Sequence, residues 1–212
     1  MRKLITLFAV AAMTVGRQAH ADDMSYSYLQ ADLQGAELSG GGYGTISGAG
    51  YAVHGSVEIG PWVYAFGDYG NTRYAGSGVK ARFLPGTAGL GGHMSLSSAI
   101  DLLGGVSAER LKIRTGVVGF PQPGTSDTFN GWGIQLGGRG WLGETFQWTF
   151  GVKYRDLHEL ESIYSVSLGG RYYFRRAWAL GMDYTYQKYQ NYILFGRDSL
   201  GSLNIRYTFG GY

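Results

Sequence analysis

The chain has no cysteine, only 4 prolines and few charged side chains among its 212 residues. The absence of cysteine excludes disulfide bonds, thiolate metal sites, a cysteine nucleophile and the lipid-bearing cysteine of a bacterial lipoprotein. Charged residues make up 16% of the chain, against about 25% in soluble domains. This composition is not typical of a secreted globule, and a hydrophobic content of 44% excludes a disordered chain.

No apolar run is long enough to cross a bilayer as a helix, which needs about 20 residues. The chain instead begins with a basic start, an apolar stretch over 4–15 and a small-residue end at 19–21. This three-part pattern is typical of a secretory signal peptide. We predict that residues 1–21 are a cleaved signal peptide and that residues 22–212 form the mature domain.

Removal of the signal peptide changes the charge balance. Arg2, Lys3 and Arg17 leave with it, so that 18 minus 3 gives 15 basic residues against 15 acidic ones. The mature chain is then neutral, and the sequence pI of 9.0 is no argument for a polyanionic partner. We therefore expect no nucleic-acid partner.

Apolar and polar residues alternate in many segments after residue 21, whereas no convincing apolar run shows helical spacing. In FQWTFGVKY, residues 146–154, the large apolar residues fall on one face and Gln147, Thr149 and Lys153 on the other. A similar segment, WGIQLGGRGWL, comes before it in the chain. The few residues between the two segments are typical of a tight hairpin turn. The closing LNIRYTF, residues 203–209, alternates in the same way almost to the end of the chain.

Ten such segments are predicted as strands, joined alternately by short and long connections. A change of parity between Tyr28 and Leu29 predicts a bulge in the first strand. All four prolines are expected in turns or loops, as they must be if every strand is paired on both sides. The short connections are expected near residues 60, 97, 144 and 175, and the long ones near 35–45, 70–87, 110–129, 155–162 and 187–199.

The direction in which the aromatic residues point, inward or outward, decides between two kinds of barrel. A soluble barrel of the lipocalin type would point them inward, but the opposite face consists of Gly, Ser, Gln and isolated charges, which make a poor soluble surface. Aromatic residues that point into lipid fit better, and backbone groups in hydrocarbon then require every strand to have two neighbours. The predicted fold class is all-β: a closed antiparallel transmembrane β-barrel, an up-and-down meander of ten strands, with eight as the alternative.

Several segments resemble those of a known family. LNIRYTF with its aromatic end resembles the C-terminal assembly signal of Gram-negative outer-membrane barrels. FNGWGIQLGGRGWL, FQWTFGVKYRD and GYAVHGSVEIGPWVYAFGDYG resemble small proteobacterial outer-membrane β-barrel proteins of the ten-stranded type. The resemblance implies export, periplasmic chaperones, insertion by the barrel assembly machinery and location in the cell outer membrane. We expect a monomer with both termini in the periplasm.

The inward face decides between a filled barrel and a pore. Eight strands are just filled by side chains, whereas water-filled porins have about 16 to 18, so ten strands favour a filled lumen. Inward glycines such as Gly133 and Gly151 leave a narrow porin-like channel for ions or small solutes as the alternative. Mixed charge signs favour internal ion pairs over a selective ring. The polar side chains expected in the lumen are His54, Glu58, Asp68, His93, Asp101, Glu109, Arg139, Lys153, Arg171, Asp183 and Arg206.

One long connection carries the only candidate for catalysis. Asp156, His158, Glu159 and Glu161 could form an acid/base or metal constellation on the rim, as in barrel hydrolases. A hairpin loop in water is normally charged, however, and no hydroxyl nucleophile lies beside a base here. We predict that the protein is not an enzyme and holds no metal or cofactor, with a rim hydrolase as the second alternative.

Basic residues gather at the end with the long connections, where we expect contact with outer-membrane lipid and with the phosphates of lipopolysaccharide. A solvated rim with acidic counter-charges is the alternative. The loop over 110–129 is the longest and most apolar, which favours contact of its middle part, residues 115–126, with a partner or host surface. The predicted function is an integral outer-membrane barrel with a structural or surface-interaction role. The basic residues are Arg73, Lys80, Arg82, Arg110, Lys112, Arg114, Arg155, Lys188 and Arg197.

Overall fold

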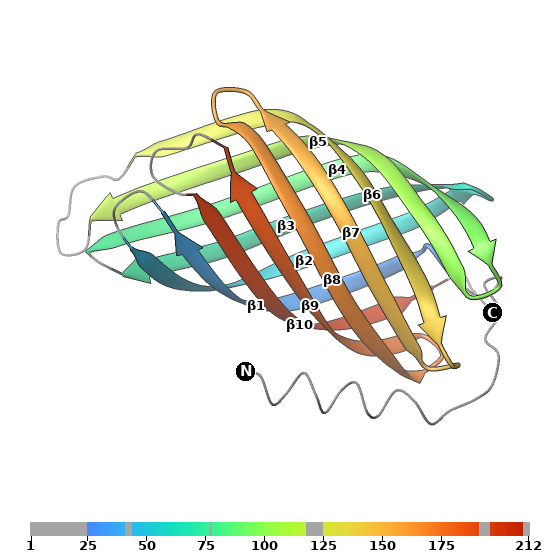
Figure 1. The fold of residues 1–212 in the computed structure, drawn as a ribbon. Coiled ribbons are helices and arrows are strands. Elements are labelled where there is room, and N and C mark those ends of the chain that lie inside the picture. The colour runs from blue at the N-terminus through green and yellow to red at the C-terminus, as the bar shows by residue number, and fades with distance from the viewer. Residues whose placement is uncertain (1–24, 41–43, 77, 118–124, 191–195, 210–212) are drawn as a thin grey trace.

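The computed structural model describes residues 25–40, 44–76, 78–117, 125–190 and 196–209. They form one barrel of ten strands (Figure 1). No helix within these residues is long and apolar enough to cross a membrane. The strands are β1 (Tyr28–Ser39), β2 (Thr45–Gly60), β3 (Val63–Gly76), β4 (Val79–Ser97), β5 (Ile100–Val117), β6 (Ser126–Leu142), β7 (Phe146–Leu157), β8 (Glu161–Arg175), β9 (Trp178–Tyr189) and β10 (Arg197–Thr208).

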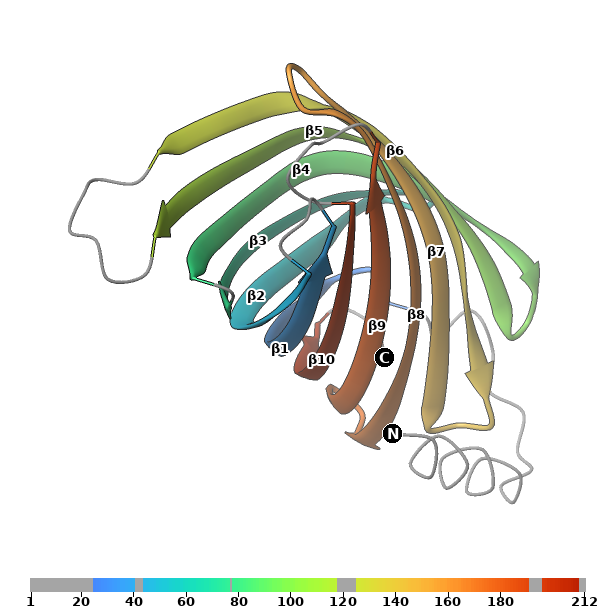
Figure 2. The same ribbon diagram turned by 60° about the vertical axis from the view of Figure 1, so that its left-hand side comes forward.

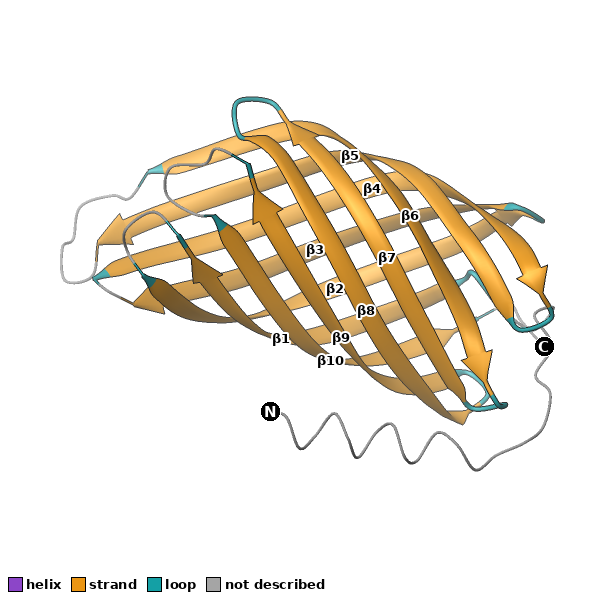
Figure 3. Cartoon of the chain, in the orientation of Figure 1, coloured by secondary structure: helices purple, strands orange, loops and turns teal. Residues whose placement is uncertain are grey.

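Every strand is antiparallel to both of its neighbours, and the last strand closes the barrel against the first (Figure 3). The β1–β10 register runs from Tyr28 opposite Thr208 to Ser39 opposite Arg197. Just past the strand ends, the backbone N–H of Phe209 donates to the carbonyl oxygen of Ser27 at 2.9 Å. The predicted closed, ten-stranded, up-and-down barrel is confirmed, and the alternative of eight strands is wrong.

We call the end where β1, β3, β5, β7 and β9 finish the loop end, and the opposite end the turn end. The turn end has short connections between β2 and β3, β4 and β5, β6 and β7, and β8 and β9. It also holds the two ends of the described barrel, since Ser25 Oγ donates to the carbonyl oxygen of Phe209 at 2.9 Å. In barrels of the outer-membrane type such short turns face the periplasm.

The middle of the outer wall is apolar, and the residues between the apolar positions point inward. At the seam of β1 and β10, Leu33 is 72% and Leu203 is 60% exposed, and the two lie opposite each other. Their chain neighbours Asp32 and Asn204 are buried inside. This placement meets the demand of a lipid solvent, which leaves apolar groups outside and polar groups in the lumen.

Near the loop end the arrangement inverts, and apolar side chains point inward. Tyr74, Phe83 and Ile113 are buried in the interior, while Arg73, Arg82 and Arg114 lie outside. This wall extends beyond the predicted strands, as Figure 2 illustrates for β5 and β6. The predicted long connection over 70–87 is therefore wrong, because β3 and β4 continue through most of it and are joined by a two-residue connection.

Two smaller predictions are also wrong. Pro85 lies within β4 and not in a loop. It faces a gap in the β3–β4 ladder, which stops at Tyr69 opposite Gly86 and resumes at Thr72 opposite Phe83, so its missing N–H breaks no hydrogen bond on that side.

The bulge predicted after Tyr28 is absent from β1, whose register with β2 and β10 is continuous. The parity changes because Tyr28 is an aromatic residue that faces the lumen. The guanidinium carbon of Arg206 lies 3.8 Å from the centre of its ring. A cation over an aromatic ring is a favourable arrangement, so the inward Tyr28 needs no local distortion of the strand.

Leu203→Lys tests the depth of the lipid-facing wall. A lysine in the middle of that wall should lower the free energy of unfolding by roughly 2–4 kcal/mol, and one near the membrane surface by about 0–1 kcal/mol. Ser199→Lys, on the same face of β10 but nearer the loop end, is the control. Urea unfolding followed by heat-modifiable gel migration measures both. Equal losses would contradict the placement of Leu203 in the hydrocarbon.

Candidate functional site

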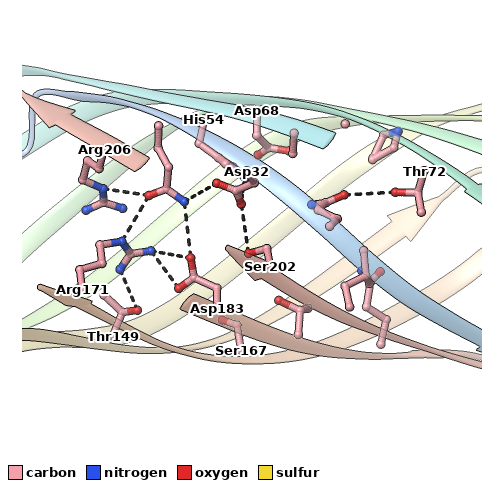
Figure 4. A pocket seen from close by; sticks show the side chains of 18 of the residues that line it. Asp32, His54, Asp68, Thr72, Thr149, Ser167, Arg171, Asp183, Ser202 and Arg206 are labelled. Atoms are coloured by element: carbon pink, nitrogen blue, oxygen red, sulfur yellow. Dashed lines mark hydrogen bonds and ion pairs between the residues drawn. The ribbon is translucent and has the colours of Figure 1, made fainter. Parts of the chain in front are cut away.

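The middle of the lumen holds a continuous network of charged and polar side chains (Figure 4). Arg171 Nη2, on β8, donates to both carboxylate oxygens of Asp183 on β9 at 2.9 Å. The amide oxygen of Gln30, on β1, accepts from Arg171 Nε at 3.3 Å and from Arg206 Nε, on β10, at 2.9 Å. The network therefore joins four neighbouring strands and includes the seam that closes the barrel.

The network continues across β1 to β2. Gln30 Nε2 donates to Asp32 Oδ1 at 2.8 Å, and the other oxygen of Asp32 lies 3.2 Å from His54 Nε2. Asn204 Nδ2 donates to Asp183 at 2.7 Å. Because each carboxylate has an opposite charge or several donors beside it, the desolvation of these buried charges is offset within the lumen.

A second polar group lies on the β4–β7 side of the lumen. Lys153 Nζ is 2.7 Å from Glu109 Oε1. Ser107 and Thr87 also donate to the Glu109 carboxylate, at 2.6 and 2.9 Å. Within the described residues, every ion pair belongs to the barrel interior.

An aromatic layer occupies the lumen at the turn end. The ring of Tyr26 stacks on His93, with centroids 3.7 Å apart, and on Tyr64 at 5.3 Å. The guanidinium carbon of Arg139 lies 3.8 Å from the Tyr26 ring centre, and the Tyr26 hydroxyl donates to Asp101. Burial raises the pKa of the Tyr26 phenol above its usual value, so the hydroxyl stays protonated and remains a donor.

A layer of buried apolar side chains occupies the lumen at the loop end. The phenol of Tyr74 donates to Asp198 Oδ2 at 2.8 Å and ties this layer to β10. The layer draws on eight of the ten strands, so it extends across the interior. Its members are Ala36, Leu38, Ile46, Tyr74, Ala81, Phe83, Leu111, Ile113, Leu157, Leu160, Ile163 and Tyr189.

Between the two end layers lies a polar cavity of about 370 Å³. Asp68, His54 and Arg171 are part of its lining, and Figure 4 shows the labelled side chains around it. Its charges are of both signs, and Arg171 and Asp183 are already paired with each other. The cavity therefore does not present the ring of like charges that a selective ion path uses.

Several inward glycines make room for large side chains. A Cβ on Gly91 would overlap the ring of Tyr64, and one on Gly89 would lie 2.6 Å from Cζ of Phe66. A Cβ on Gly181 would lie 2.6 Å from Cγ of Arg171. Such contacts are too short for packed carbon atoms.

The structure places all eleven lumen residues named from the sequence at positions in register with the interior. It brings Arg171, Asp183 and Arg206 into one network through Gln30, and His54 joins through Asp32. Sequence reasoning missed Tyr26, Gln30 and Asp32, although Gln30 and Asp32 alternate with the apolar Leu29, Ala31 and Leu33. Among the eleven, Glu58 is exposed at the turn end.

At the loop end, one residue expected to contact lipopolysaccharide lies inside the barrel, and the residues considered for catalysis point in different directions. Arg155, expected to contact lipopolysaccharide, is 9% exposed and donates to Ser165 and Gln187 in the interior. Asp156 lies on the opposite, outer face of β7, and His158 is exposed on the turn that follows. Within the described residues, no group of three or more His, Cys, Asp or Glu could hold a metal ion. The residues expected to contact partners, 115–126, lie mostly outside the described residues, as does the signal peptide over 1–21.

The closed barrel with an apolar outer wall and a polar lumen defines a membrane-spanning β-barrel of the outer-membrane type. The family model for the outer membrane protein β-barrel domain matches residues 5–163 of the 212-residue chain. The chain belongs to this family, and is thus a Gram-negative outer-membrane β-barrel protein. A search of the curated proteins found no match.

Comparison with solved structures finds three outer-membrane proteins among the similar chains. Neisserial surface protein A is 14% identical with a TM-score of 0.52, covering 87% of this chain and 98% of that one. The transport unit of the autotransporter AIDA-I from Escherichia coli is 11% identical with a TM-score of 0.50, covering 96% and 97%. Ail, the attachment invasion locus protein of Yersinia pestis, is 12% identical with a TM-score of 0.45, covering 88% and 100%. At these identities the likeness to the first two structures shows the fold alone.

Asp183→Asn tests the central network. It leaves the buried Arg171 guanidinium without its counter-charge, which should lower the free energy of unfolding by about 3–5 kcal/mol. Glu37→Gln, which removes an exposed carboxylate from the outer face of β1, should change it by less than about 0.5 kcal/mol. Chemical unfolding in detergent micelles measures both, and a neutral result for Asp183→Asn would show that the network does not stabilise the barrel.

Gly91→Ala tests the packing of the turn-end layer. The added methyl group must displace the Tyr64 ring, and overpacking of this kind costs about 1–3 kcal/mol. Gly201, with nothing within 4 Å of its Cβ position, provides the control substitution Gly201→Ala. The temperature of heat-modifiable unfolding should fall for Gly91→Ala only. A similar fall for both variants would indicate that glycine matters through strand conformation and not through space.

Proposed function

We propose that the protein is a sealed outer-membrane barrel, which acts as a structural or surface-interaction protein and not as a channel. The observation that carries this proposal is the pair of side-chain layers at the two ends of the lumen. The aromatic layer around Tyr26 and Tyr64 lies at the turn end, and the apolar layer around Tyr74 and Phe83 lies at the loop end.

Paired charges in the middle layer support the same function. Arg171 is paired directly with Asp183, and Lys153 with Glu109, so a solute in the lumen meets charges that are already neutralised by each other. Breaking a buried ion pair costs several kcal/mol. A rigid, filled lumen supports the wall, and leaves the loop end as the part of the molecule that meets partners.

A narrow channel is the first rival, and the cavity of about 370 Å³ is the feature that favours it. Planar-bilayer recording of the purified protein separates the two. We expect no stable unitary currents from the natural chain, because clusters of packed side chains lie in the lumen on both sides of the cavity.

The matched control removes those side chains. A variant with Tyr26→Ala and Tyr64→Ala at the turn end, together with Tyr74→Ala and Phe83→Ala at the loop end, should conduct if it retains heat-modifiable folding. Stable currents from the natural chain would contradict the proposal. If neither protein gave currents and the variant was folded, the ion pairs of the middle layer would be the barrier to conduction.

A rim hydrolase is the second rival, and its candidate residues are not gathered. Asp156 points away from the interior and His158 lies on a turn, where an exposed charged group is ordinary. Loss of a measured hydrolytic activity in His158→Ala, with folding intact, would overturn the non-enzymatic function.

Assembly as a monomer by periplasmic chaperones and the barrel assembly machinery is part of the proposal.

A further inference from the structure

The outer face of β3, β4 and β5 near the loop end is strongly basic. Arg73 lies opposite Arg82, and Arg82 lies opposite Arg114, so three arginines stand side by side on neighbouring strands. We call the following six residues the basic face: Arg73, Lys80, Arg82, Arg110, Lys112 and Arg114. All six alternate with interior residues such as Phe83 and Ile113, so they point outward.

Among the described residues, no carboxylate lies on the outer face of β2 to β6 to balance these charges. Within the described parts of β2 to β6, each Asp or Glu stands in register with interior residues. Asp127, for instance, lies opposite the buried Ile113, and Glu58 lies opposite the buried Tyr64. The others are Asp68, Asp101 and Glu109. On these strands the basic face is therefore a cluster of positive charge without a counter-charge.

Like charges directly opposite each other on neighbouring strands destabilise a sheet. The side chains of Arg73, Arg82 and Arg114 begin only about 5 Å apart from strand to strand. Arg82 Nε donates to the neutral amide oxygen of Asn71 at 2.8 Å, and the ion pairs of the described residues are all in the interior. Such a row is stable when an anion lies across it.

The position of the basic face along the barrel indicates which kind of anion it binds. The outward positions of β4 and β5 pair in successive rows towards the turn end, with Arg82 and Arg114 in one row and Leu84 and Lys112 in the next. The rows that follow are Gly86 with Arg110, Ala88 with Ala108, and Leu90 with Val106. Leu90 is 54% and Val106 is 60% exposed, as lipid-facing residues are. The charge thus ends where the apolar wall begins, at the depth of lipid headgroups.

We propose that the basic face binds the phosphate groups of a phosphorylated glycolipid in the outer leaflet of the surrounding membrane. Guanidinium groups bind phosphate oxygens through paired, charge-assisted hydrogen bonds, and neighbouring arginines can share one phosphate. The acyl chains of the same lipid then lie along Leu90 and Val106. A soluble polyanion would gain nothing from this apolar continuation, which favours the lipid.

The basic face is narrower than the set of basic residues expected from the sequence. Arg155 is inside the barrel, and Lys188 and Arg197 lie opposite each other on β9 and β10, away from β3 to β5. The proposed site does not depend on whether the lumen is sealed, because it uses outward side chains only. A conducting barrel would leave it unchanged.

The test compares two double variants that each remove two positive charges from the loop end. Arg82→Gln with Arg114→Gln removes two charges of the basic face. Lys188→Gln with Arg197→Gln is the matched control. Each pair also removes one arginine that donates to an outer-wall side chain, Arg82 to Asn71 and Arg197 to Ser39. The probe is bis-phosphorylated lipid A, titrated into the folded protein in neutral detergent, with bound lipid counted by native mass spectrometry.

We expect binding by the natural chain, an affinity about tenfold or more lower for the basic-face variant, and a change of less than about twofold for the control. Enzymatically dephosphorylated lipid A should bind weakly to all three. Arg82→Lys with Arg114→Lys should retain part of the affinity, since lysine keeps the charge and loses the paired geometry. Heat-modifiable migration verifies folding of each variant.

Three results would overturn the proposal. Equal weakening in both double variants would show a diffuse effect of net charge. Equal binding of the dephosphorylated lipid would exclude phosphate recognition. Binding of inositol hexakisphosphate to the basic face as tightly as lipid A would identify a soluble polyanion, and not a membrane lipid, as the occupant.

Discussion

The whole structure depends on the absence of water around its backbone. In hydrocarbon an unpaired N–H or C=O has no partner, so a sheet can cross the membrane only when it has no edge. The pairing of β1 with β10 along the full length of both strands meets this requirement. It also explains why an ordered strand reaches almost to the end of the chain, where termini usually fray. Antiparallel order and the inward direction of every second residue then follow from the closed wall.

The side chains on the outer face change along each strand because the surrounding solvent changes from lipid to water. On β5, Val106 and Ala108 face outward while Ser107 and Glu109 face the lumen; three residues further on, Lys112 is outside and Ile113 is buried inside. The alternation keeps its period of two while the apolar side moves from the outer face to the inner one. Lipid demands the first arrangement and water the second, so the barrel continues past the membrane as a wall with an apolar interior. The basic face lies at this change.

Much of the fold could be predicted from the sequence because alternation with period two is a strong signal. The strands with apolar outer faces, such as 146–154, were predicted with their turns. The loop-end portions of β3 and β4 were missed because their apolar residues, Tyr74 and Phe83, belong to the opposite face. Of the interior, the charged residues were predicted by parity, but their partners were not. Nothing in the order of residues shows that Gln30 bridges Arg171 and Arg206, which come from distant parts of the chain.

The two ends of the described barrel meet at Ser25, Ser27 and Phe209. A short linker could therefore join them at the turn end without stretching the backbone. The chain could then be reopened at the connection between β6 and β7, also at the turn end, so that β7 comes first and β6 last. Such a circular permutant would contain the same ten pairings, with its new termini on the same side of the membrane. The seam between β1 and β10 is thus distinguished by the order of the chain and not by the bonds that it contains.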